Sequence, residues 1–222
     1  MDINEFSRRL CASFHLKAMS SRAFVHLNDC VIVGMALVKV PVMSSYKLYF
    51  TIYPLWRSTL KGCLDIPLFQ IALLDDKGFE IYLHAEIDDG YAQSLIEKCR
   101  EQFALLSGDI SFANMIISLN NHIAHDKSIN SNFVLNMKIY ELIYGVALYN
   151  NDLEAANNIY NLISGQISQW DADVFRYWYG EKEDYLKSLK EYEPNRNQII
   201  ENVKANLNNP KIAKVHRFKM LH

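Results

Sequence analysis

The hydrophobic period of this chain changes from alternating to helical near residue 88, and that change limits the folds open to it. Between residues 46 and 53 apolar and polar side chains alternate strictly, whereas from Asp88 onward apolar residues recur at helical spacing. Alternation is typical of a strand with one buried face, and the longer period is typical of an amphipathic helix. We therefore expect an α+β fold, in which a small antiparallel β-sheet with flanking helices is followed by an all-α half built of helical hairpins.

Three strands are predicted between residues 22 and 54. An amphipathic helix over residues 4–17 precedes them, because its apolar residues recur at helical spacing. Two β-branched runs then flank Asn28-Asp29, which tolerate the positive φ angles of a two-residue hairpin turn. The third run alternates and ends at Pro54. These three runs predict an antiparallel meander with one face on a core.

The pattern between residues 55 and 86 is less regular. The run LFQIALLDD is too short and too apolar for its period to separate strand from helix. Asp75 to Gly78 form a predicted turn, and residues 79–86 alternate again. We predict a further strand there, with its inward side chains at Phe79, Ile81, Leu83 and Ala85.

A polar linker with the sequence HDKSINSN occupies residues 125–132. It is the expected boundary between an α+β domain over residues 1–126 and a helical subdomain over residues 127–222 that packs against it. Residues 133–150 are apolar nearly all round, which predicts a buried central helix. The basic C-terminal segment KIAKVHRFKMLH is expected to be a solvated end.

The composition is that of a soluble globular protein, with half of the residues hydrophobic and 22% charged. No run reaches the roughly 18 to 20 apolar residues that a membrane-spanning helix needs. Four cysteines lie far apart without a CxxC pair, and the N-terminal segment, with acids at Asp2 and Glu5, lacks the pattern of a secretion signal. We therefore expect a cytoplasmic protein with reduced thiols and no membrane association.

Charge is distributed unevenly along the chain. Residues 66–210 contain 11 Lys or Arg against 21 Asp or Glu, and the last twelve residues contain four basic residues and no acid. A face that binds nucleic acid must neutralise phosphates, so the acidic body argues against a nucleic-acid partner. The same acidic body favours a basic protein partner, which it would attract by electrostatic steering.

The sequence contains no glycine-rich phosphate loop, GxSxG or HExxH motif, and only 8 glycines. We therefore assign no catalytic, cofactor-binding or metal-binding residue and expect no cofactor.

Two histidine groups keep an enzymatic alternative open. His122 and His125 lie at i and i+3, a spacing that brings two imidazoles within reach of one metal ion. His84 stands between Glu80 and Glu86 on one predicted strand face, a setting for acid–base chemistry. The alternative function is a small metal- or histidine-dependent hydrolase or nuclease.

The outward side of the third predicted strand is the most suggestive surface for a partner. Tyr, Trp and Arg are enriched at binding hot spots, because each combines a large contact area with a polar group. The opposing interpretation is that helices of the second half cover this side and make it core. The residues that we predict to bind a partner are Lys47, Tyr49, Tyr53, Trp56 and Arg57.

Residues 140–163 resemble part of a tetratricopeptide repeat. Asn151 to Ala156, followed by Tyr160, match the turn and the start of the second helix in that family. Tyr144 stands where the family has a small residue, and Ser168 stands where it has the closing proline. No second copy aligns roughly 34 residues further on. The resemblance implies a helical hairpin, and a helical-repeat adaptor is a further alternative function.

Residues 1–125 carry a second resemblance. An amphipathic helix, the runs RAFVHL, CVIVGMALVKV and YKLYFTIYPLW, a late strand and paired helices follow one another in this order. This order is similar to that of uncharacterised bacterial α+β proteins of the toxin-immunity type. The resemblance implies a non-enzymatic protein that binds and occludes a toxin, and it provides no site residues.

Overall fold

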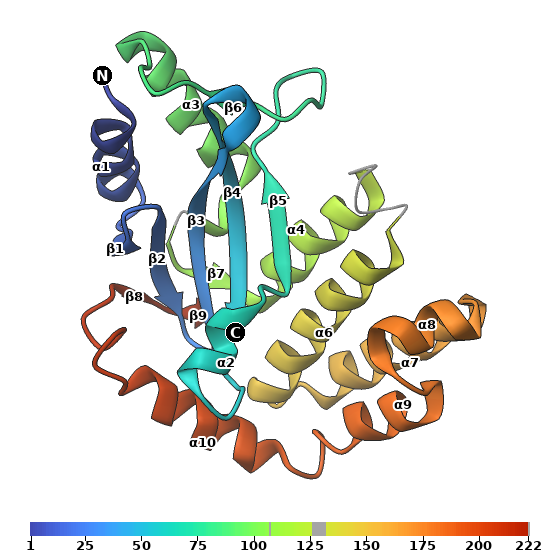
Figure 1. Ribbon diagram of the computed structural model, residues 1–222. Helices are drawn as coiled ribbons and strands as arrows, with labels where there is room; N and C mark the ends of the chain where they lie inside the picture. The colour runs from blue at the N-terminus through green and yellow to red at the C-terminus, as the bar shows by residue number, and fades with distance from the viewer. Residues whose placement is uncertain (107, 126–131, 222) are drawn as a thin grey trace. The chain divides into compact units, whose positions relative to one another are not determined.

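Figure 1 shows the computed structural model of the chain, which describes residues 1–106, 108–125 and 132–221. An antiparallel sheet of several strands with helices precedes a mostly helical C-terminal half, which confirms the α+β prediction. The chain forms two compact units. The sheet unit comprises Met1–Tyr53, Phe69–Ser111 and Asn208–Leu221, and the helical unit comprises Pro54–Leu68 and Phe112–Leu207.

The sheet unit contains strands from the beginning, middle and end of the chain. Strands β1 to β5 neighbour one another in chain order, while β6 pairs with β4 and β8 pairs with β2. A separate parallel pair joins β7 to β9. The elements are α1 (Ile3–Ser13), β1 (Lys17–Ser20), β2 (Ala23–Asn28), β3 (Val31–Val40), η1 (Pro41–Met43), β4 (Ser45–Pro54), β5 (Phe69–Ala72), β6 (Tyr82–Leu83), α3 (Asp89–Gln102), η2 (Ala104–Leu106), β7 (Ile110–Ser111), β8 (Arg217–Phe218) and β9 (Met220–Leu221).

The predicted hairpin forms between β2 and β3, but its turn lies one residue later than expected. Asn28 pairs with Val31, so Asp29 and Cys30 make the two-residue connection. Asp29 has a φ of 45°, a conformation that Asp adopts more readily than most residues. Its carboxylate also accepts a hydrogen bond of 2.6 Å from the backbone N–H of Met220. The turn is therefore stabilised by a long-range hydrogen bond as well as by the suitability of Asp for this backbone conformation.

Strand β4 has most of the predicted alternation, although Thr51 on its predicted outward side is also buried. Tyr46, Leu48, Phe50 and Ile52 are all buried. The ring of Phe50 stacks on that of Phe103 at a centroid distance of 4.8 Å and meets the edge of Phe69 at 5.7 Å. The ambiguous run after residue 66 contributes β5, which pairs with β4 from Tyr49 to Ile52. Burial of one face of this strand pair forms the centre of the sheet unit.

The strand predicted over residues 79–86 is largely wrong. Only Tyr82 and Leu83 form a strand, β6, and the expected inward residue Phe79 is 67% exposed. The reason lies in the preceding turn. Asp75 accepts hydrogen bonds of 2.9 Å from the backbone N–H groups of both Lys77 and Phe79, which curls the chain back locally.

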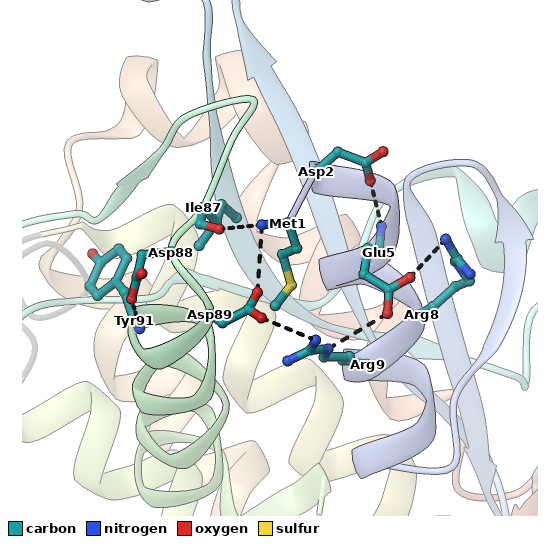
Figure 2. Close-up of polar contacts among 9 residues, drawn as sticks. All are labelled: Met1, Asp2, Glu5, Arg8, Arg9, Ile87, Asp88, Asp89 and Tyr91. Carbon is teal, nitrogen blue, oxygen red and sulfur yellow. Dashed lines mark hydrogen bonds and ion pairs between the residues drawn. The ribbon is translucent and has the colours of Figure 1, made fainter.

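Helix α1 is fastened to the start of α3 by the polar contacts drawn in Figure 2. The Met1 amino group donates to the Ile87 carbonyl at 2.7 Å and lies 3.5 Å from the Asp89 carboxylate. Arg9 bridges the two helices, because its guanidinium lies 3.6 Å from Glu5 and 3.8 Å from Asp89. These contacts hold the first helix of the sheet unit in place.

The C-terminal segment is part of the fold and not the solvated end that we expected. Ile212, Val215 and Met220 are buried. β8 pairs parallel with β2, and the His216 carbonyl accepts a 2.9 Å hydrogen bond from the Leu27 backbone N–H. The basic side chains of this segment are mostly exposed, while its apolar residues lie in the core. The net charge of the segment therefore does not show that part of it is buried.

The helical unit is built around one buried helix, as predicted. That helix, α6, has buried residues on every side, and the polar side chains of Asn132 and Asp152 cap the N-termini of α6 and α7. None of the helices in the described parts of the chain is both long and apolar enough to cross a membrane. The helices are α2 (Leu60–Asp65), α4 (Phe112–His125), α6 (Phe133–Tyr149), α7 (Leu153–Gln169), α8 (Ala172–Tyr179), α9 (Lys182–Lys190) and α10 (Arg196–Leu207).

The division into units differs from the predicted cut at residue 126. The segment Pro54–Leu68, which interrupts the sheet strands in sequence, belongs to the helical unit. The Asn206 side-chain amide of α10 donates hydrogen bonds of 2.8 Å to the carbonyls of Leu55 and Arg57. Because these contacts join residues about 150 positions apart, a search for one polar linker does not find them.

Candidate partner-binding site

The five residues predicted to bind a partner belong to different units. Lys47, Tyr49 and Tyr53 lie on β4 in the sheet unit, whereas Trp56 and Arg57 lie in the helical unit. Lys47 forms an ion pair with Glu80, which raises the pKa of its ammonium group. Both tyrosines of β4 are half-buried, and burial raises the pKa of each phenol.

Trp56 is buried, with only 8% of its surface exposed, and so it does not present its ring to a partner. The ring packs against Gly145 of α6, where an added Cβ would lie 2.3 Å from Trp56 Cζ2. Arg57 is half-buried and lines a cavity of the helical unit together with Trp56 and Glu141. The structure therefore brings these two predicted residues together, but at a cavity and not on an open strand face.

The histidines of the enzymatic alternative do not form a cluster among the residues that the structure describes. His84 is exposed, and its predicted neighbour Glu80 is the ion-pair partner of Lys47. His122 lies on α4, and the side chain of His125 falls outside the described residues. Over the described ranges, no group of three or more His, Cys, Asp and Glu side chains is arranged to hold a metal ion.

Helix α8 carries aromatic residues on two opposite sides. On the inner side Phe175 is fully buried, and its ring contacts those of Trp170 at 5.5 Å, Tyr179 at 5.3 Å and Tyr185 at 5.6 Å. These contacts include edge-to-face and stacked geometries, which aromatic pairs prefer. The inner side of α8 therefore holds the helix to the rest of the helical unit.

The outer side of α8 leaves three large apolar residues in solvent. Val174, Tyr177 and Trp178 are spaced i, i+3 and i+4, so they share one face of the helix, which we name the α8 aromatic face. Tyr177 is 82% exposed and Trp178 is 57% exposed. Their rings contact each other edge-on at a centroid distance of 5.3 Å. Adjacent exposed aromatic rings make this face a candidate surface for contact with another molecule.

Polar contacts fix the ends of α8, so the aromatic face is presented by an ordered helix. Asp171 caps the N-terminus by accepting from the backbone N–H groups of Asp173 and Val174 at 2.9 and 3.1 Å. Arg176 forms ion pairs with Asp173 at 2.9 Å and with Glu181 at 2.6 Å. Binding through this helix would need little ordering of the backbone, which keeps the entropic cost of association low.

A groove of about 450 Å³ adjoins the α8 aromatic face in the helical unit. Val174 belongs to both features, and the groove also contains the half-exposed ring of Phe133, which meets Trp170 edge-on at 5.1 Å. A groove beside exposed aromatic rings suits an apolar side chain from a partner. The lining residues are Asn132, Phe133, Val134, Gln169, Trp170, Asp171 and Val174.

The surroundings of α8 are acidic. Residues 171–184 contain five Asp or Glu and two basic residues, Arg176 and Lys182. Both bases have partners, because Arg176 pairs with the acids above and Lys182 donates a 2.6 Å hydrogen bond to the Trp170 carbonyl. The field beside the aromatic face is therefore negative, which favours a partner with basic residues around an apolar centre.

No protein-family model matches the chain, and no curated protein or solved structure matches it either. None of the residues that the sequence predicted to bind a partner lies on the α8 aromatic face. Its signal is the run FRYWY, which places four aromatic residues within five positions of a short helix. Aromatic residues at neighbouring positions point in different directions on a helix, so at least one of them must face outward.

Proposed function

We propose that this chain is a non-enzymatic, cytoplasmic protein that binds a protein partner through the α8 aromatic face and the adjoining groove. The observation that carries the proposal is a short helix that buries Phe175 completely while leaving Tyr177 and Trp178 in solvent. Tyrosine and tryptophan at such positions are the residue types that dominate binding energy at protein interfaces. In the immunity-type form of this proposal, the partner is a bacterial toxin that the protein occludes.

The acidic surroundings specify the chemistry of the partner. A basic surface with an apolar centre would place its cations against Asp173, Glu181 and their neighbours while it covers the rings of Tyr177 and Trp178. Opposite charges around the rim mainly accelerate association, whereas the buried aromatic rings mainly slow dissociation. If charge attraction alone held the partner, the aromatic rings would not slow its dissociation.

The experiment measures binding of the purified protein to the proteins encoded beside its gene. We expect one of them, a basic protein, to bind, and we expect Tyr177→Ala and Trp178→Ala each to weaken binding by about thirtyfold, or about 2 kcal/mol, as removal of a hot spot does. The matched control is Tyr91→Ala, which removes a half-exposed aromatic ring in the sheet unit.

Two results would overturn the proposal. One is the absence of binding to every neighbouring gene product. The other is a complex in which Trp178→Ala and Tyr91→Ala bind as tightly as the unmodified chain, because the α8 aromatic face would then lie outside the interface. Circular dichroism and thermal unfolding of each variant exclude a general loss of folding.

A further inference from the structure

The helical unit contains a cavity of about 170 Å³ that the proposed partner surface does not use. Aromatic and aliphatic side chains form most of its walls, and two side chains of opposite charge, Glu141 and Arg57, line it. An engineered apolar cavity of about 150 Å³ binds benzene, so this space suits a ligand of roughly six to ten non-hydrogen atoms. The lining residues are Trp56, Arg57, Leu68, Glu141, Tyr144, Gly145, Tyr185, Ser188, Leu189, Tyr192 and Ile199.

Glu141 is a half-buried carboxylate on the central helix α6. Its Oε1 atom accepts a hydrogen bond from the Tyr185 hydroxyl, and no basic group of the described chain lies within the 4.0 Å of an ion pair. Burial raises the pKa of Glu141, while the Tyr185 hydrogen bond and the nearby charges of Arg57 and Lys138 lower it. The carboxylate thus retains an oxygen, Oε2, for a further donor.

Arg57 is the positively charged side chain that lines the cavity, opposite in charge to Glu141. One guanidinium nitrogen, Nη1, donates a 2.7 Å hydrogen bond to the Gly62 carbonyl, which leaves further N–H groups of the same fork. Within the described ranges Arg57 has no ion-pair partner. It acts on the pKa of Glu141 through its charge, yet the two groups do not form an ion pair with each other.

We propose that this cavity binds a small zwitterion of the α-amino acid type, whose ammonium group meets Glu141 and whose carboxylate meets Arg57. A simple cation would be repelled by the guanidinium, and a simple anion would be repelled by the carboxylate. A molecule that carries both charges satisfies both side chains at once, and its carbon atoms would lie against the rings of Trp56 and Tyr144.

A second groove of about 420 Å³ adjoins the cavity. It shares Trp56, Ser188, Tyr192 and Ile199 with the cavity, and its remaining lining residues, among them Asn195, are polar. Tyr192 is 45% exposed and stands where the two spaces meet. A charged ligand can therefore approach through polar surroundings before it loses its water to the aromatic walls.

The position of Trp56 is fixed before any ligand arrives. The Asn202 side-chain amide of α10 donates a 3.0 Å hydrogen bond to the Trp56 carbonyl, and Gly145 allows the indole ring to lie directly against α6. A wall held in this way loses little freedom on binding, which favours affinity for a small ligand.

The test titrates the full chain with L-valine, L-leucine and L-isoleucine, and records heat and Trp fluorescence. We expect at least one of them to bind. Its amide, which lacks the carboxylate, and its deaminated carboxylic acid, which lacks the ammonium group, should each bind at least about tenfold more weakly. Glu141→Gln and Arg57→Gln should each weaken binding of the amino acid to a similar extent. The Glu141→Gln substitution keeps a side-chain carbonyl oxygen as an acceptor for Tyr185, so this variant tests the charge with little change of packing.

The matched control is Glu154→Gln, which removes an exposed carboxylate from α7 and should leave binding unchanged. The inference is overturned if none of the three amino acids binds, if an amide binds as tightly as its parent amino acid, or if Glu141→Gln binds normally. Trp178→Ala should retain amino acid binding. Failure of this inference is therefore distinguishable from failure of the proposed partner surface.

Discussion

Gly145 in helix α6 is a position where the packing of the helical unit requires a glycine. A glycine inside a helix normally costs about 1 kcal/mol relative to alanine. Here the missing Cβ makes room for Trp56, whose Cζ2 atom lies 2.3 Å from the position that a Cβ would occupy. The close approach of a buried indole ring explains why glycine stands in the middle of α6.

We predict that Gly145→Ala destabilises the protein by about 2 kcal/mol in spite of its better helix propensity, because a rigid ring must move. Urea unfolding measures the change. Gly165→Ala is the control, since a Cβ there meets nothing within 4 Å, and it should raise the free energy of unfolding by up to about 1 kcal/mol. Equal effects of the two substitutions would contradict this explanation.

His26 is a buried base without a partner. It is fully buried in β2, and neither ring nitrogen has a hydrogen-bond partner among the described residues. Its ring meets the edge of Phe218 at 4.9 Å. Burial lowers the pKa of His26 from 6.5 to about 4, and the nearby charges of His216 and His15 act in the same direction. The folded protein therefore holds this imidazole in its neutral form.

This shift predicts a pH dependence with a definite sign. Between pH 6.5 and about 4 the unfolded chain binds a proton at residue 26 that the folded chain does not, so stability falls as the pH falls through this window. The contribution amounts to about 3 kcal/mol. We expect His26→Leu to remove this part of the slope in urea unfolding measured across the window. An unchanged slope in the variant would show that His26 does not titrate as argued.

At the scale of elements, the sequence predicts long periodic segments well. Strand β4 and helix α6 lie where the pattern placed them, because many residues repeat the same signal. Residues 79–86 show why short segments fail. Alternation over eight residues appears strand-like, but Asp75 and Gly78 form a turn, and of the segment only Tyr82 and Leu83 form a strand, while Glu80 and Glu86 form isolated bridges.

The C-terminal segment was misjudged for a related reason. Its strands β8 and β9 are each two residues long, too short for any period, and their partners are strands far away in sequence. The apolar residues that anchor the segment are scattered among basic ones. Only the three-dimensional fold brings Ile212 and Met220 into a core.

We predict that Ile212→Ala lowers the free energy of unfolding by about 2 to 4 kcal/mol, as removal of a fully buried side chain does. Lys211→Ala, at the exposed neighbouring position, should change it by less than about 0.5 kcal/mol. Thermal or urea unfolding of the two variants is sufficient. Similar small effects for both would restore the view of the segment as a solvated end.

At the scale of the whole molecule, the α+β class and the acidic character of the helical segments were predictable from the sequence, and the α8 aromatic face was not. The sequence pointed to Tyr49 and Tyr53 because alternation placed them opposite a core. The structure leaves these residues half-buried and leaves Tyr177 and Trp178 exposed. Exposure depends on which elements pack together, and the local period of one segment does not contain that information.

The acidic surroundings of α8 predict how association with the partner responds to salt. Raising the ionic strength should lower the association rate constant by about tenfold or more and leave the dissociation rate constant nearly unchanged, because rim charges act mainly before contact. Stopped-flow binding at several salt concentrations measures both constants. An association rate constant that does not change with salt would show that electrostatic steering does not contribute to binding.

Amide hydrogen exchange, with and without the bound partner, is the measurement that tests the central claim most directly. Protection should appear in α8 and in residues 132–134 beside the groove, while residues 47–53 of β4 exchange as they do in the free protein. Protection confined to β4, with α8 unchanged, would contradict the assignment of the binding surface to the α8 aromatic face.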